Sequence, residues 1–125
     1  MIGYVTLGTK DIAKATAFYD ELLTRLGATK AYSSEKFVAW RTGEGQPMLS
    51  VVIPFNGEPA TAGNGTMIGL SAPDTETVDK LHALALALGG TNEGDAGLRS
   101  SGFYSGYFRD LDGNKLNFFC AGQPE

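Results

Sequence analysis

The hydrophobic and polar positions at the start of the chain predict a strand followed by a helix. Residues 2–8 alternate in a way that is typical of a β-strand, whose neighbouring side chains point to opposite faces. Asp11 is a residue type that caps helices, and Gly27 is one that ends them. Between them, apolar side chains recur with helical spacing at Ala15, Phe18, Tyr19, Leu22 and Leu26.

Three further strands are expected after this helix. Residues 28–33 and 35–41 are rich in β-favouring side chains, and a turn at 43–47 contains two glycines and a proline. The apolar run at 48–55 is the third strand. The first module, about residues 1–55, is therefore predicted to have the order β-α-β-β-β.

The same order starts again after a connector at about residues 56–65, which is rich in Gly, Pro, Ala and Thr. Shifting the sequence by 63 residues aligns Asp11 with Asp74, so a second helix is expected to begin there. Near the end of each half the best shift is 68, and it aligns Arg41 with Arg109. We place the extra residues of the second half in a longer loop.

That longer loop is expected around residues 94–101, where it would shape any pocket. The second module then spans about residues 66–121. Neither module could bury both faces of its short sheet alone, so we expect one domain over residues 1–125.

The segment 103–120 closes the second module. Two runs of aromatic and β-favouring residues flank Asp110-Leu111-Asp112-Gly113-Asn114, and the Asp-Gly pair predicts a tight β-hairpin. A chain that ends in this hairpin after a duplicated βαβββ order resembles the vicinal-oxygen-chelate superfamily. That superfamily contains glyoxalase I, extradiol dioxygenases and the bleomycin- and fosfomycin-resistance proteins.

The resemblance implies an α+β fold, the glyoxalase/bleomycin-resistance fold. In it, two βαβββ modules form a curved, mixed, eight-stranded sheet, the helices cover the outer face and the concave face holds the ligand. Strand alternation assigns side chains to that concave face, with a register that could slip by one residue and so exchange the faces. The candidate ligand-binding residues are Tyr4, Phe37, Arg41, Leu49, Met67, Ser105, Tyr107, Arg109, Asn117 and Phe119.

Metal-dependent members of the superfamily hold one divalent ion with side chains from the first and last strands of each module. The matching positions here are Tyr4, Leu49 or a neighbour, Met67 and Asn117. This set has no carboxylate and no imidazole, so we expect neither a metal nor another cofactor. His82, the sole histidine, lies on the apolar face of the second helix and is expected to be structural.

The composition of the chain indicates which kinds of partner to expect. The formal net charge is -4, and the sequence has no cluster of Lys or Arg that could bind a phosphate backbone. Nucleic acid is therefore not an expected partner. No signal core precedes the first strand and no apolar run is long enough to span a bilayer, so we expect a cytoplasmic protein without a membrane partner.

Cys120 is the only cysteine and excludes an internal disulfide. Exposed sheet edges favour a homodimer.

Three classes of function remain open. The first is a small-molecule-binding protein that sequesters or senses its ligand. Arg41 and Arg109 would favour an anionic or zwitterionic ligand. The second is an enzyme, either a lyase or isomerase that uses Tyr4, Tyr107 or His82 for proton transfer, or a glyoxalase-type enzyme with displaced metal ligands. The third is a partner domain with a vestigial cavity.

Overall fold

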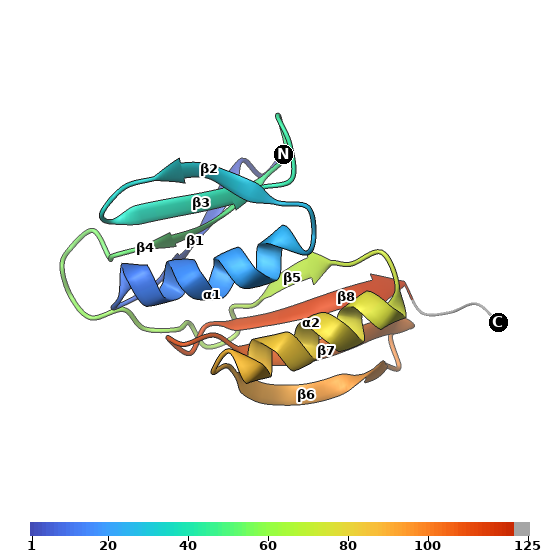
Figure 1. The fold of residues 1–125 in the computed structure, drawn as a ribbon. Coiled ribbons are helices and arrows are strands. Elements are labelled where there is room, and N and C mark those ends of the chain that lie inside the picture. The colour runs from blue at the N-terminus through green and yellow to red at the C-terminus, as the bar shows by residue number, and fades with distance from the viewer. Residues whose placement is uncertain (122–125) are drawn as a thin grey trace. The chain divides into compact units, whose positions relative to one another are not determined.

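The computed structural model describes residues 1–121 and divides the chain into two compact units. The first unit is Met1–Ala62 and the second begins at Gly63, inside the connector that the sequence predicts. Each unit holds one βαβββ module (Figure 1).

Module one forms a four-stranded sheet covered by one helix. Its elements are β1 (Tyr4–Gly8), α1 (Ile12–Thr24), β2 (Thr29–Ser33), β3 (Phe37–Arg41) and β4 (Met48–Val52). The strand order is β1-β4-β3-β2, with β1 parallel to β4 and the other pairs antiparallel.

Module two repeats this arrangement. Its elements are β5 (Ile68–Ser71), α2 (Thr75–Ala87), β6 (Thr91–Leu98), β7 (Phe103–Arg109) and β8 (Lys115–Ala121). The strand order is β5-β8-β7-β6, and the parallel pair is again the one between the first and last strands, β5 and β8. The predicted α+β class with two tandem βαβββ modules is confirmed, and within residues 1–121 the eight strands pair as two four-stranded sheets.

Matching caps explain why the two helices begin at matching places. The Asp11 carboxylate accepts a hydrogen bond from Lys14 N at 3.1 Å, and the Asp74 carboxylate accepts one from Thr77 N at 2.8 Å. Each satisfies a backbone N–H that the first turn of a helix leaves without a partner. Within residues 1–121 no helix is both long and apolar enough to cross a membrane.

The core of module one lies between α1 and one face of its sheet. The buried strand residues on this face are Leu7, Val38, Trp40, Leu49 and Val51. Trp40 is only 1% exposed, and its Nε1 donates a hydrogen bond to Asp20 Oδ1 of α1 at 2.8 Å. This bond fixes α1 on the sheet, because a buried indole N–H needs an acceptor.

The core of module two lies between α2 and the equivalent face. Phe108 and Phe118 stack with ring centroids 5.2 Å apart, and both are fully buried with Leu116. Cys120 continues the same row and is also buried. In each module the opposite face of the sheet carries no helix of that module; we call it the open face.

Two expectations from the sequence are wrong in detail. The sequence predicts Leu49 on the concave face, but Leu49 pairs with Val5 and Trp40 and packs beneath α1, so Met48 lies on the open face instead. The reason is a turn of six residues at 42–47, where the equivalent turn at 110–114 has five. One extra residue exchanges the faces of the strand that follows.

The expected loop at 94–101 is also shorter. Most of these residues belong to β6, and the connection between β6 and β7 is residues 99–102. The additional length is taken up by irregular pairing with β7, where the register shifts between Asn92 and Gly94 and again between Gly94 and Gly97. Bulges of this kind add residues to a strand without opening a loop.

Candidate functional site

The open face of module one has an aromatic groove with a volume of about 390 Å³. It is lined by Tyr4, Ala31, Tyr32, Phe37, Arg41 and Met48. The Phe37 ring lies edge-on to both tyrosines, with centroid distances of 6.2 Å to Tyr4 and 5.7 Å to Tyr32. Tyr4 remains 59% exposed and Tyr32 56% exposed, so solvent reaches this aromatic surface.

Strand pairing explains how the groove is assembled. Tyr4 of β1 lies opposite Met48 of β4, and Tyr32 of β2 lies opposite Ala39 of β3. Paired residues share a face of the sheet, so four strands contribute to one surface. Ala39 is small and buried, which leaves room for the larger rings around it.

Among residues 1–121, Arg41 is the one charged residue that lines this groove. Its Nη2 lies 3.4 Å from Glu44 Oε1, and Glu44 is almost fully exposed in the turn that follows β3. An exposed ion pair of this kind contributes little to stability, in the range of about 0–1 kcal/mol. A ligand anion can therefore compete with Glu44 for Arg41 at small cost.

The open face of module two carries the other predicted residues. Tyr107 pairs with Asn117, and Ser105 pairs with Phe119, in the antiparallel ladder of β7 and β8. Ser105 is 1% exposed and Asn117 is 6% exposed, whereas Tyr107 and Phe119 are half-buried. Met67 precedes β5 and is exposed.

Two buried polar atoms on the open faces have no hydrogen-bond partner within residues 1–121. They are Ser50 Oγ of β4 and Asn117 Oδ1 of β8. Both lie in the middle of the last strand of their module, at equivalent places in the two ladders. A buried polar atom without a partner costs about 1–3 kcal/mol, so neither residue is placed there for stability.

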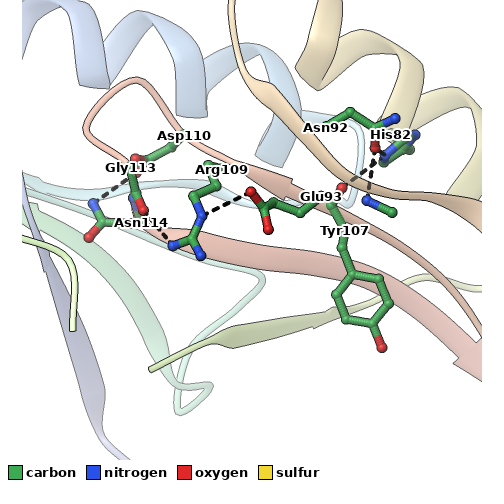
Figure 2. A network of polar contacts seen from close by, with 9 residues as sticks. His82, Asn92, Glu93, Tyr107, Arg109, Asp110, Gly113 and Asn114 are labelled. Atoms are coloured by element: carbon green, nitrogen blue, oxygen red, sulfur yellow. Dashed lines mark hydrogen bonds and ion pairs between the residues drawn. The ribbon is translucent and has the colours of Figure 1, made fainter. Parts of the chain in front are cut away.

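Arg109 is fixed by its own hairpin. Its Nη1 donates to the Gly113 carbonyl at 2.9 Å and its Nε lies 3.3 Å from Glu93 Oε2 (Figure 2). The predicted tight turn is present, with Gly113 at φ +87°. Arg41 and Arg109 therefore both begin a hairpin turn, as expected, and each has a carboxylate partner.

His82 is buried on the helix-covered side of module two, away from the open face. Its Nε2 lies 3.0 Å from the Tyr107 carbonyl and 3.2 Å from Asn92 Oδ1 (Figure 2). Both partners are acceptors, so Nε2 carries the proton and donates to them. The ring also lies against Gly106, where an added Cβ would be 2.9 Å from it. These contacts give His82 a structural role.

The helix-facing side of β7 and β8 has two groups with altered ionisation. The Tyr104 hydroxyl donates to Asp79 Oδ1 at 2.6 Å, and this hydrogen bond raises the pKa of Tyr104, with a smaller contribution from burial. Desolvation by burial raises the pKa of the neighbouring Cys120 thiol. Neither group is activated as a nucleophile or base by its surroundings.

The positions that match metal ligands in related proteins carry poor donors. With the correction to Met48, they hold one phenol, two thioethers and one amide, at Tyr4, Met48, Met67 and Asn117. Among residues 1–121 no group of three His, Cys, Asp or Glu side chains is placed to hold a metal ion. The donor set therefore does not fit a hard or borderline divalent ion.

Sequence reasoning missed three residues of the groove, Ala31, Tyr32 and Met48. Tyr32 could have been found by pairing the second strand with the third, because it then shares a face with Phe37. Met48 required the length of the turn before it, and Ala31 lies in a register shift between Lys30 and Tyr32 that alternation cannot foresee.

Comparisons with known proteins agree with this architecture. Residues 1–118 match the family model of the Glyoxalase/Bleomycin resistance protein/Dioxygenase superfamily. A glyoxalase/bleomycin resistance protein from Albidiferax ferrireducens T118 is 34% identical, with 99% of each chain covered and a TM-score of 0.88. The hypothetical protein SA1046 from S. aureus is 26% identical, covers 97% of this chain and 93% of its own, and has a TM-score of 0.74.

A third solved structure, a family enzyme from Burkholderia phytofirmans PsJN, is 22% identical, covers 95% of this chain and 97% of its own, and has a TM-score of 0.78. At that identity the likeness concerns the fold alone. No curated protein matches the chain. The duplicated βαβββ order, the closing hairpin and the match over residues 1–118 lead to one conclusion: this chain belongs to the Glyoxalase/Bleomycin resistance protein/Dioxygenase superfamily.

Proposed function

We propose that this protein binds a small molecule, by sequestration or as a sensor, and that the groove of module one is its main ligand-binding surface. The observation that carries the proposal is the groove itself. It combines two exposed tyrosine rings, the half-buried Phe37 ring, the Met48 thioether and one arginine in about 390 Å³. Small-molecule sites are commonly apolar and aromatic, with a few polar groups that orient the ligand, and many have volumes of about 300–1,000 Å³.

The lining indicates a planar, apolar ligand with one negative charge. Tyr4, Tyr32 and Phe37 offer ring faces and edges for an aromatic or flat ring system. Met48 adds a polarisable side chain that adapts to ligand shape. Arg41 presents a guanidinium group that pairs with a carboxylate or sulfonate and is held only by the exposed Glu44.

Binding is favoured over catalysis because, among residues 1–121, neither a carboxylate nor an imidazole lines the groove, and these groups are common general bases. His82, the only imidazole in the chain, is buried behind the sheet with its Nε2 proton donated to the Tyr107 carbonyl. In the part of the chain that the structure describes, the ionisable side chains lining the groove are Tyr4, Tyr32 and Arg41.

The proposal is tested with a matched pair of probes, 2-naphthoate and the uncharged 2-naphthol, titrated by isothermal calorimetry. We expect both to bind and naphthoate to bind more tightly, because only the carboxylate can pair with Arg41. Phe37→Ala should weaken both probes at least tenfold by removing the central ring. Arg41→Ala should remove the preference for naphthoate and leave naphthol binding unchanged.

The control for Arg41 is Arg25→Ala, which also removes an arginine from an exposed ion pair of module one. It should leave both affinities unchanged. Binding that survives Phe37→Ala, or the absence of binding by either probe, would contradict the assignment of the groove. Mass spectrometry over several hours would show whether a bound ligand is changed chemically. Such a change would contradict the hypothesis that the protein only binds its ligand.

A further inference from the structure

The open face of module two carries two cations around one tyrosine. Arg99 Cζ lies 5.2 Å from the centroid of the Tyr107 ring, and Lys115 Nζ lies 5.5 Å from it. Arg99 belongs to the connection between β6 and β7, and Lys115 begins β8, on the other side of β7. We propose that Arg99, Tyr107 and Lys115 form a binding site for a tetrahedral oxyanion, such as the phosphate group of a small molecule.

The Arg99 guanidinium lies against two glycines of β6. A Cβ added at Gly94 would lie 3.4 Å from Arg99 Nη2 and 3.3 Å from a ring carbon of Tyr107, and one added at Gly97 would lie 3.6 Å from Arg99 Nη1. The guanidinium therefore rests over two glycines, next to the Tyr107 ring. Its Nη2 also donates to the Asp95 carbonyl. This arrangement fixes the group while leaving other N–H donors free.

Arg99 and Lys115 form no ion pair with a carboxylate of residues 1–121. Within residues 1–121, no Asp or Glu oxygen lies within 4 Å of the charged nitrogens of Arg99 or Lys115, although five other ion pairs form there. The nearby acids are already engaged: Glu93 pairs with Arg109, and the Asp95 carboxylate accepts a hydrogen bond from Asn92 Nδ2 at 2.7 Å. A negative charge at Tyr107 would therefore meet two uncompensated cations.

The donors match an oxyanion with three accessible oxygens. The guanidinium offers a planar fork of N–H groups, the ammonium offers three rotatable N–H groups, and the Tyr107 hydroxyl extends away from the buried contacts of its backbone (Figure 2). Arg99 comes from the connection between β6 and β7, Tyr107 from β7 and Lys115 from β8, so the three donors belong to neighbouring segments around one ring. A carboxylate has only two oxygens and leaves one donor group without an anionic acceptor.

The net charge of the chain is negative, which disfavours anion binding elsewhere on the molecule. At -4, the molecule as a whole repels anions, so any affinity for phosphate has to come from a local cluster of donors. This site uses none of the residues that line the groove of module one. It therefore stands or fails independently of the function proposed for that groove.

The test is a titration of the full chain with inorganic phosphate at constant ionic strength, followed by ¹H-¹⁵N NMR. We expect saturable shifts concentrated at residues 94–99, 107 and 115. The double variant Arg99→Ala/Lys115→Ala should weaken phosphate binding at least tenfold, and Tyr107→Phe should weaken it by a smaller factor. The matched control Lys14→Ala/Arg25→Ala removes two positive charges from α1 and should leave the affinity unchanged.

Several outcomes would overturn the proposal. They are the absence of saturable shifts, equal losses in the two double variants, or acetate binding as tightly as phosphate at the same residues. The melting temperature of each variant without phosphate, compared with the parent, shows that the fold is intact. If Arg99→Ala/Lys115→Ala fails to fold, Arg99→Gln/Lys115→Gln provides the same test, because it removes both positive charges while keeping two long polar side chains.

Discussion

Asp110 should be the most sensitive residue of the closing hairpin. Its Oδ1 accepts hydrogen bonds from the backbone N–H groups of Asp112 and Asn114, both at 2.9 Å, and its Oδ2 accepts one from Asn114 Nδ2 at 3.0 Å. Figure 2 shows Asp110 beside Asn114. Asp110 is only 6% exposed. Asp110→Ala would therefore leave these donors without their acceptor inside a turn that water reaches poorly.

The cost follows from the donors that lose their partner. Asn114 N and Nδ2 are buried, so each would cost about 1–2 kcal/mol, while Asp112 N is partly exposed and regains water. We expect Asp110→Ala to lower the free energy of unfolding by about 2–4 kcal/mol. At roughly 4 °C per kcal/mol for a chain of this size, the melting temperature should fall by about 8–16 °C.

The assay is urea unfolding followed by far-ultraviolet circular dichroism, because the lone Trp40 reports on module one and the hairpin lies in module two. Asp110→Asn should lie between parent and Asp110→Ala, since one carbonyl oxygen remains. Glu35→Ala, which removes the same charge from an exposed residue, is the control. A difference of less than about 0.5 kcal/mol between Asp110→Ala and Glu35→Ala would refute the reasoning.

Four further predictions follow from other parts of the molecule. Gly106→Ala should destabilise the protein by about 1–3 kcal/mol in the same urea assay, because its Cβ meets the buried His82 ring at 2.9 Å. Tyr104 should titrate above its usual pKa of 10.0 when its absorbance is followed at 295 nm, and Asp79→Asn should lower that midpoint. Folding favours the neutral phenol, so the stability that the Tyr104 hydrogen bond contributes is present at neutral pH and is lost as the pH rises through the raised pKa. EDTA, Zn²⁺, Ni²⁺ and Mn²⁺ should leave the melting temperature unchanged, and stoichiometric metal in elemental analysis would contradict this. Sedimentation should give about twice the chain mass of 13.2 kDa if the chain dimerises, as we propose, and a mass near 13.2 kDa would contradict it.

The fold could be predicted because local signals repeat. Asp11 and Asp74 cap helices that begin and end 63 residues apart, and Gly113 supplies the positive φ of the last turn. Each of these signals depends on a few neighbouring residues. A duplicated order of such signals then identifies the architecture even where single strands are ambiguous.

The candidate site could be predicted from the sequence only in part, because it depends on which face of a strand each residue occupies. One additional residue in the turn before β4 moves Leu49 under α1 and brings Met48 to the open face. The contact between Arg99 and Tyr107 was even harder to predict. Arg99 follows β6, and the pairing of β6 with β7 shifts register twice. Neither alternation nor the repeat describes such a contact, which depends on tertiary geometry.

Cys120 gives the protein a built-in reporter of local opening. A buried thiol reacts with an alkylating reagent only when the structure around it opens, and its raised pKa slows any reaction further. Because the chain has one cysteine, the labelling rate relative to an unfolded control measures the opening free energy around β8 alone. Module one, which has no thiol, contributes no signal, so ligands of the two modules can be told apart by which of them slows the labelling.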